Sequence, residues 1–156
     1  MNLWKHFLHN ILVNQYSRGI TSAISLSSAT RERTSGTYNI SARTSNGPIT
    51  MSFPQSPLNA TQYIDARTSN APLFVKLHNA FEGEFRLRTS NGPSNVQRHQ
   101  QACDPSGAGR MRIVELAHGG MGAVAGNATW GIPAAGSLPL GRAIFETSNS
   151  PAQLIV

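Results

Sequence analysis

This chain of 156 residues contains little cysteine and few charged residues. Its single cysteine, Cys103, excludes an intramolecular disulfide framework and leaves no second thiolate for a cysteine-based zinc site. Only 13% of the residues are charged, which argues against disorder, because disordered chains combine high charge with low hydrophobicity. No apolar run is long enough to span a bilayer, and residues 1–13 are too interrupted by polar side chains for a convincing signal peptide. We therefore expect one folded unit without a metal centre, a cofactor or a transmembrane segment.

Aromatic residues are also scarce, at 7%, and they do not interleave with the arginines as they do in proteins that stack on nucleic-acid bases. This argues against nucleic acid as a partner. Thirteen basic residues against seven acidic ones give a net charge of +6. Eleven of the basic residues are arginine, a side chain suited to bidentate contact with carboxylate, sulfate or phosphate.

Glycine and proline are plentiful instead, at 14 and 9 residues, and they surround a phrase that occurs four times. The phrase is Thr-Ser-Asn, then Gly, Ala or Ser, then Pro, and it occupies residues 44–48, 68–72, 89–93 and 147–151. Alternating apolar and polar residues flank the copies, so the pattern predicts strand, tight turn, strand. The expected turn residues are Asn46, Gly47, Asn70, Asn91, Gly92 and Asn149. We expect a shared backbone conformation, with positive φ at the asparagine or at the next residue.

The spacing of the phrase predicts the architecture. Successive threonines of the phrase lie 24, 21 and 58 residues apart, and the last interval predicts about three further units with the phrase eroded. An ordinary β-sandwich would also have a turn every 8–12 residues or so. Recurrence of the turn sequence itself favours stacking, because identical turns can lie above one another. The predicted fold class is all-β, a β-solenoid-like stack of short strands.

The N-terminal part follows a different pattern. Apolar residues from Leu3 to Leu12 recur at helical spacing, which predicts a short helix within Met1–Asn14 that covers the first strands. Residues 15–33 read as a linker with one strand around Ile20 to Leu26. We therefore divide the chain into an N-terminal helix and linker, 1–33, and a β-repeat domain, 34–156.

Five motifs in a fixed order resemble one protein family. They are the eight residues from Asp65, the run Phe-Glu-Gly-Glu-Phe from Phe81, the run Asp-Pro-Ser-Gly-Ala-Gly-Arg from Asp104, the pair Trp130-Gly131, and the last copy of the phrase from Thr147. Together they resemble an uncharacterised fungal domain of unknown function, itself similar to adhesin-like β-solenoids. The resemblance covers about Thr34 to Val156. It implies a cell-surface or secreted adhesin-like module, and it supplies no catalytic residue.

Three arginines occupy the same position in the phrase. Arg43, Arg67 and Arg88 each precede the threonine, so stacking in register would place them in a stripe about 4.8 Å apart on neighbouring strands. Such a stripe would suit an anionic polysaccharide, and another surface protein is the alternative partner. The alternative reading is a solvated strand face whose charges prevent edge-to-edge aggregation. Glu146 takes the position in the fourth copy and interrupts the stripe.

A catalytic alternative rests on Glu82 and Glu84, which flank Gly83. Paired carboxylates are the groups that glycoside hydrolysis uses, so the second reading is a carbohydrate-active hydrolase or lyase on a β-helix. Phe81 and Phe85 alternate with the two glutamates, however, which is typical of an ordinary strand with one exposed face. We therefore predict a non-enzymatic interaction module with no catalytic residue.

Overall fold

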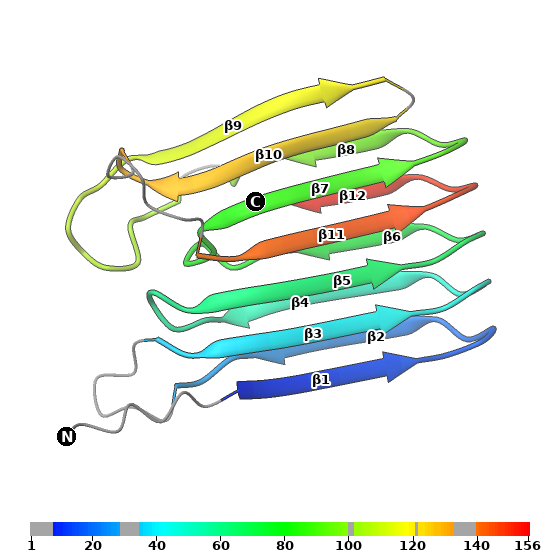
Figure 1. Cartoon of the computed structure of the whole chain (residues 1–156), viewed down its shortest axis with the longest axis horizontal. Helices are drawn as coiled ribbons and strands as arrows, with labels where there is room; N and C mark the ends of the chain where they lie inside the picture. The colour runs from blue at the N-terminus through cyan, green and yellow to red at the C-terminus, as the bar shows by residue number, and fades with distance from the viewer. Residues whose placement is uncertain (1–7, 29–34, 100–101, 121, 133–139) are drawn as a thin grey trace.

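The computed structural model describes residues 8–28, 35–99, 102–120, 122–132 and 140–156 (Figure 1). These ranges contain twelve strands and no helix, which confirms the all-β prediction, and so nothing within them is a helix able to cross a membrane. The strands are β1 (Leu8–Asn14), β2 (Ile20–Ser25), β3 (Thr37–Arg43), β4 (Ile49–Gln55), β5 (Thr61–Arg67), β6 (Leu73–Lys76), β7 (Gly83–Thr89), β8 (Ser94–Gln97), β9 (Arg112–Gly119), β10 (Ala123–Trp130), β11 (Arg142–Thr147) and β12 (Ala152–Ile155).

The strands form two sheets that pack face to face. The seven-stranded sheet has the order β1-β3-β5-β11-β7-β10-β9, and the five-stranded sheet has the order β2-β4-β6-β12-β8. All pairs are parallel except β7 with β10 and β10 with β9. Each copy of the phrase lies where the chain leaves one sheet and enters the other.

The last strand pair does not lie at the end of the sheets. β11 lies between β5 and β7, and β12 lies between β6 and β8 (Figure 1). Besides β8 and β11, the interval between the third and fourth copies of the phrase holds β9 and β10, which pair antiparallel in the seven-stranded sheet alone. The expected three eroded units are therefore wrong. The hairpin instead extends one sheet past the other.

Alternation places the core between the two sheets. Along β7 every second residue is buried, from Gly83 to Thr89. In the seven-stranded sheet the large Phe145 stands in register with Ala66, and in the next inner row Phe85 stands in register with Ala143. Large and small side chains thus share each row, and both phenylalanines are at most 2% exposed. Full burial of one such side chain stabilises the fold by roughly 1.5–3 kcal/mol.

The predicted N-terminal helix is wrong where the structure describes it, and residues 1–7 lie outside the described ranges. β1 pairs with β3 in parallel register over its whole length, and Ile11 and Val13 pack against the core. Its apolar residues fit helical spacing, but in-register pairing with β3 outweighs this local pattern. β2 covers most of the strand expected around Ile20 to Leu26, and it pairs with β4.

The positive φ expected at the turns is also wrong. Among the described non-glycine residues only Ser35 and Asn59 have positive φ, and Gly47 and Gly92 are not among the glycines that do. Glycine is required there for a different reason. A Cβ on Gly47 would lie 2.1 Å from the carbonyl oxygen of Arg18, and one on Gly92 would lie 2.4 Å from that of Ser150. The neighbouring turn simply passes too close for a side chain.

The four asparagines of the phrase form a ladder of side-chain amides. Asn70 donates to Asn46 at 2.8 Å, Asn149 donates to Asn70 at 2.7 Å, and Asn91 donates to Asn149 at 2.7 Å. The order follows the strands in space rather than the chain. Such ladders form when identical residues stack in register, so asparagine at this position stabilises the contact between turns.

The threonines of the phrase are buried and bind backbone groups. Thr68 donates to the carbonyl oxygen of Gly47 at 3.0 Å, and Thr147 donates to that of Ala71 at 3.2 Å. Each hydroxyl thus provides a hydrogen bond for a backbone carbonyl group of the neighbouring turn. Thr44 and Thr89 accept from the amides of their own glycines. A buried hydroxyl needs a partner, and the phrase supplies one within or beside every turn.

Candidate functional site

The three arginines of the expected stripe lie in one row on the outer face of the seven-stranded sheet. Arg43 is in register with Arg67, Arg67 with Glu146, and Glu146 with Arg88. Arg43 and Arg88 are exposed and Arg67 is half-exposed. Because neighbouring strands are about 4.8 Å apart, the row is a line of four charges with a carboxylate in the third place.

The arginines of this row form ion pairs with two carboxylates, Asp65 beside the row and Glu146 within it. Asp65 accepts from Nη2 of Arg43 and from Nε of Arg67, both at 2.6 Å, and Glu146 lies 2.9 Å from Nη1 of Arg67. The hydrogen bond to Asp65 raises the pKa of the Arg67 guanidinium. The side chains of Arg43 and Arg67 are still 56% and 42% exposed. Exposed ion pairs contribute only about 0–1 kcal/mol, so another anion can displace the carboxylates at little cost.

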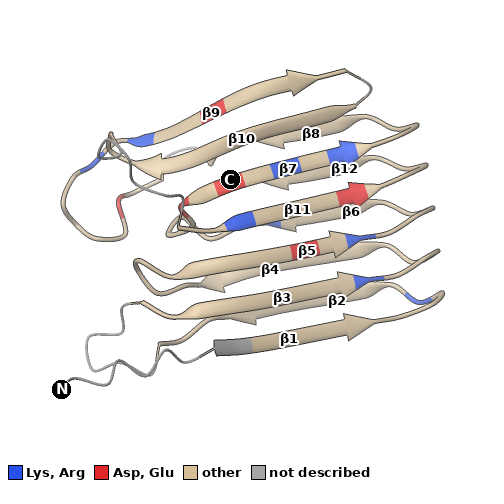
Figure 2. Cartoon of the chain, viewed as in Figure 1, with Lys and Arg blue, Asp and Glu red and all other residues tan. Residues whose placement is uncertain are grey.

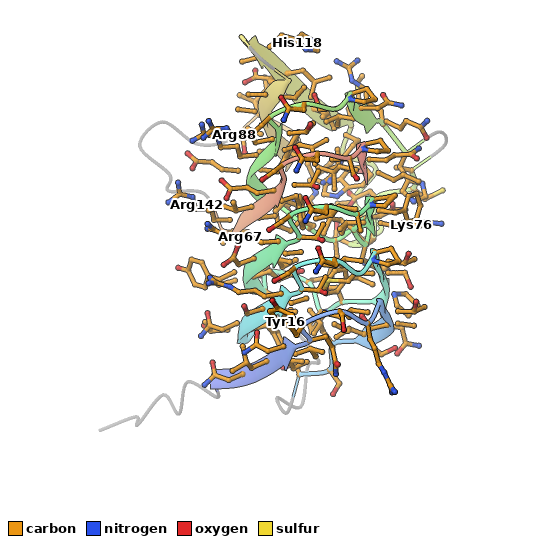
Figure 3. All side chains as sticks on the ribbon, turned by 90° about the vertical axis from the view of Figure 1, so that its right-hand side faces the viewer. Tyr16, Arg67, Lys76, Arg88, His118 and Arg142 are labelled. Atoms are coloured by element: carbon orange, nitrogen blue, oxygen red, sulfur yellow. The ribbon has the colours of Figure 1, made fainter. Side chains whose placement is uncertain are left out.

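The outer face of this sheet carries charges of both signs on β3, β5, β11, β7 and β9 (Figure 2). Its outward positions hold five arginines, at 43, 67, 86, 88 and 142, and four carboxylates, at 65, 84, 115 and 146. Figure 3 shows Arg67, Arg88 and Arg142 on one side of the molecule and Lys76 on the other. Arg86, Arg88 and Arg142 have no ion pair among the described residues. These three are available to a ligand.

A hollow of about 370 Å³ lies beside the row, over β1, β3, β5 and β11. Tyr63, 48% exposed, and Leu12, 69% exposed, contribute its apolar surface. Arg142, in register with Tyr63 on the next strand, contributes an unpaired cation. The small Ser41, in register with Leu12 and Asp65, is also part of the lining. An apolar surface with a few polar groups at its border is the usual make-up of a ligand site.

A second hollow, of about 590 Å³, lies on the other side of the same arginines. Arg43 and Arg67 line it together with Tyr16, which is 80% exposed. The two hollows therefore adjoin the ion-paired cluster of Arg43, Asp65 and Arg67 from opposite sides. Each hollow has one exposed tyrosine in its lining, Tyr63 in the first and Tyr16 in the second.

The two glutamates of the catalytic alternative have different environments. Glu82 accepts a hydrogen bond from the amide of Trp130 at 3.2 Å and lies 3.8 Å from Nη1 of Arg110. Glu84 is exposed on the outer face, in register with Arg142. Gly83, with φ of +149°, separates them. One carboxylate is thus held in a polar network while the other faces solvent.

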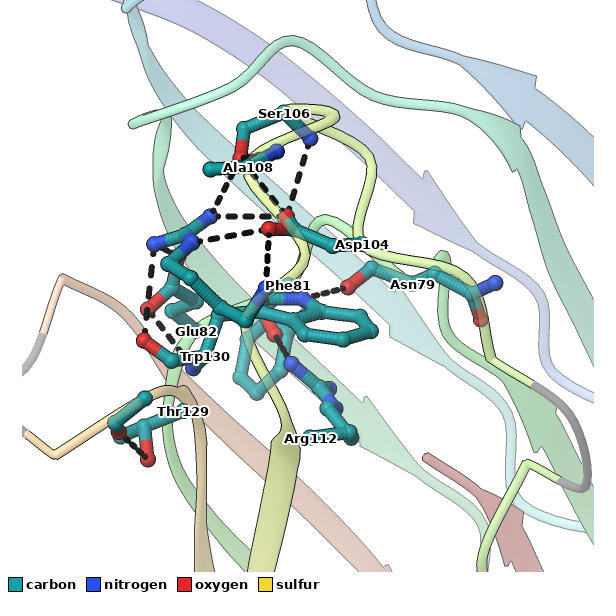
Figure 4. A network of polar contacts seen from close by, with 11 residues as sticks. Asn79, Phe81, Glu82, Asp104, Ser106, Ala108, Arg112, Thr129 and Trp130 are labelled. Atoms are coloured by element: carbon teal, nitrogen blue, oxygen red, sulfur yellow. Dashed lines mark hydrogen bonds and ion pairs between the residues drawn. The ribbon is translucent and has the colours of Figure 1, made fainter.

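That network joins three of the motifs behind the family resemblance (Figure 4). The carboxylate of Asp104 accepts from the Arg110 side chain at 3.0 and 3.1 Å and from the Ser106 hydroxyl at 2.8 Å. These hydrogen bonds, chiefly those from Arg110, hold the pKa of Asp104 well below its usual range. The indole of Trp130 donates to the carbonyl oxygen of Asn79 at 2.8 Å. Arg110 also lies 3.8 Å from Glu82, which directly precedes β7, so this ion pair joins the loop after β8 to the segment before β7. We call this set of contacts the clamp.

Arg112 lies inside the same network. Its Nη1 donates to the carbonyl oxygen of Phe81 at 2.8 Å, and its guanidinium carbon lies 5.3 Å from the centre of the Trp130 ring. Burial lowers the pKa of Arg112 to about 10, so the side chain stays charged at neutral pH. The cation is stabilised by the aromatic face and by one carbonyl, which makes it part of the clamp rather than of an accessible site.

Within the described residues, no group of three or more His, Cys, Asp or Glu side chains is placed to bind a metal. Cys103 is exposed, and His78 accepts a hydrogen bond from the amide of Ala80. Burial, followed by the charge of His99, lowers the pKa of His78.

Sequence reasoning located the arginine row but missed its surroundings. Alternation along residues 61–67 already predicts that Tyr63, Asp65 and Arg67 share the outer face. The sequence did not predict that Arg142 lies beside Tyr63. That neighbourhood exists because the C-terminal pair of strands is inserted into the sheets, which places β11 next to β5. Comparison of the chain with protein-family models, with curated proteins and with solved structures finds no match.

Proposed function

We propose that the protein is a non-enzymatic interaction module that binds an anionic polysaccharide along the outer face of its seven-stranded sheet. The observation that carries this proposal is the row in which Arg43, Arg67 and Arg88 lie in register. Glycans are extended, so a row across neighbouring strands offers repeated contacts. Uronate or sulfate groups of the ligand can replace Asp65 and Glu146 as ion-pair partners of the arginines, since those exposed pairs contribute little stability.

The hollow beside the row supports a carbohydrate ligand rather than a simple counter-ion. Tyr63 offers a half-exposed ring on which the apolar face of a sugar can pack, and Arg142 on the adjacent strand can bind its acidic group. We expect binding to be weak and sensitive to salt, because exposed charges are screened beyond about 10 Å at ordinary ionic strength. Tyr63→Ala should weaken binding while leaving the salt dependence unchanged.

The stacked strand pairs further support a classification as a short β-solenoid with its last pair inserted, similar to adhesin-like domains. In that classification the face of one sheet serves as an adhesive surface. Location at a cell surface and membership of the fungal family stay predictions.

The experiment that tests the function is an array of acidic and neutral polysaccharides, with product formation measured on the same polymers. We expect retention on acidic polymers, loss of retention at high salt, and no shortened or unsaturated products. Binding restricted to neutral polymers would contradict the acidic ligand. Cleavage abolished by Glu84→Gln would instead favour the alternative, a carbohydrate-active hydrolase or lyase.

A further inference from the structure

The two sheets differ in length, so the edge strand β8 has no neighbour at the place where the other sheet continues. Beyond β7 the seven-stranded sheet continues with β10 and β9, whereas the five-stranded sheet ends at β8. Val114 and Leu116 of β9 pack against the core yet stay only partly buried. The overhanging hairpin therefore has apolar side chains where the five-stranded sheet has no further strand.

Backbone groups of β8 face this unfilled position. Toward β12, the carbonyl oxygen of Gln97 accepts from Val156 at 3.0 Å and the amide of His99 donates to Val156 at 2.7 Å. In a parallel pair, successive residues point their backbone groups to opposite sides. The groups of Val96 and Arg98 consequently point away from β12, and no strand within the described residues pairs with that edge.

Side chains at this edge are apolar or basic. Val96, Arg98 and His99 at this edge line a hollow of about 640 Å³ together with Leu116 of the overhanging hairpin. The far side of the hollow is formed by Ile155 of β12 and Lys76 of β6, away from the free edge. No described carboxylate lines the hollow. Of the six described carboxylates, four lie on the outer face of the seven-stranded sheet and two lie in the Asp104 network. Charge complementarity at this hollow therefore favours an anionic partner.

We propose that an extended acidic segment of a partner protein adds to the free edge of β8 as a sixth strand of the five-stranded sheet. Its backbone pairs with Val96 and Arg98, its alternate apolar side chains cover Leu116, and its carboxylates bind Arg98. Main-chain pairing gives such complexes their affinity, and the side chains give them specificity. The site lies at the end of the five-stranded sheet and the arginine row lies on the other sheet, so the site does not depend on the polysaccharide proposal.

The test uses the full chain and three short capped peptides as probes. One alternates valine with glutamate, the second alternates valine with lysine, and the third is the glutamate peptide with proline at its centre. We expect only the first to bind, and hydrogen exchange of the Val96 and Arg98 amides to slow at least about tenfold in its presence. Equal binding of the proline peptide would overturn strand addition, and equal binding of the lysine peptide would overturn the acidic ligand.

Variants of the protein complete the test. Reversing one exposed charge with Arg98→Glu should weaken binding of the glutamate peptide at least about tenfold, which is about 1.4 kcal/mol. The matched control, Arg88→Glu on the other face, should leave the affinity unchanged. No binding of the glutamate peptide at millimolar concentration, or equal affinity for both variants, would refute the site.

Discussion

Replacing Gly47 by alanine tests the close approach of neighbouring turns. The new Cβ would lie 2.1 Å from the carbonyl oxygen of Arg18, whereas real Cβ atoms essentially never approach within 3.0 Å. The turns must therefore separate by about 1 Å. Separation would break the bond from Thr44 to Arg18, now 3.2 Å, and that from Ser45 to Tyr16, also 3.2 Å. Overpacking costs about 1–3 kcal/mol, and each lost hydrogen bond about 0.5–1.5 kcal/mol.

We expect a loss of about 3 kcal/mol in the free energy of unfolding and a Tm about 6–12 °C lower. The measurement is urea and thermal unfolding followed by circular dichroism. Gly120→Ala is the matched control, because its Cβ would meet nothing within 4 Å and its φ is not positive. It should change stability by less than about 1 kcal/mol.

A third variant separates close approach from backbone conformation. If Gly47 were needed for positive φ, asparagine would be tolerated there, since asparagine adopts that region readily. Because the restriction is space, Gly47→Asn should destabilise at least as much as Gly47→Ala. An unfolding free energy for Gly47→Ala close to that of Gly120→Ala, or a stable Gly47→Asn protein, would refute the reasoning.

Two further predictions concern polar contacts. Asn70→Ala removes two rungs of the amide ladder and should lower the free energy of unfolding, measured in urea, by roughly 1 kcal/mol. Asn95→Ala, at an exposed position outside the ladder, should lower it less. Equal losses would count against the ladder. The second concerns acid. Because the folded state lowers the pKa of Asp104, its stabilisation is complete above the unfolded-state pKa near 4 and is lost as the pH falls. The wild type should therefore lose more stability than Asp104→Asn between neutral pH and acid, and parallel pH profiles would contradict the clamp.

Most strands of the fold could be predicted from the sequence, because alternation and turn residues are local signals. The alternating residues before the second copy of the phrase form β5, and those before the third copy form β7. Two features could not be predicted. β1 has a helical apolar pattern, and only pairing with β3 makes it a strand. The position of β11 between β5 and β7 depends on which strands meet in space, which no local pattern encodes.

The candidate site was predictable to the same extent. Position in the phrase placed Arg43, Arg67 and Arg88 in one row, because it fixes their register. It did not predict that Asp65 would bind two of them, since that requires knowing which outward neighbours lie within reach. The electrostatic character of the row is therefore a result of the structure, not of the pattern.

The most direct test of the polysaccharide proposal is the affinity of the triple variant Arg43→Gln, Arg67→Gln, Arg88→Gln for an acidic polysaccharide. The control replaces Arg18, Lys76 and Arg98 by glutamine, the same change in net charge away from the row. Calorimetric titration at low salt should show binding lost in the first variant and kept in the second, with both unfolding within a few degrees of the wild type. If the first variant binds as tightly as the wild type, the row is a solvated strand face and the proposed function is wrong.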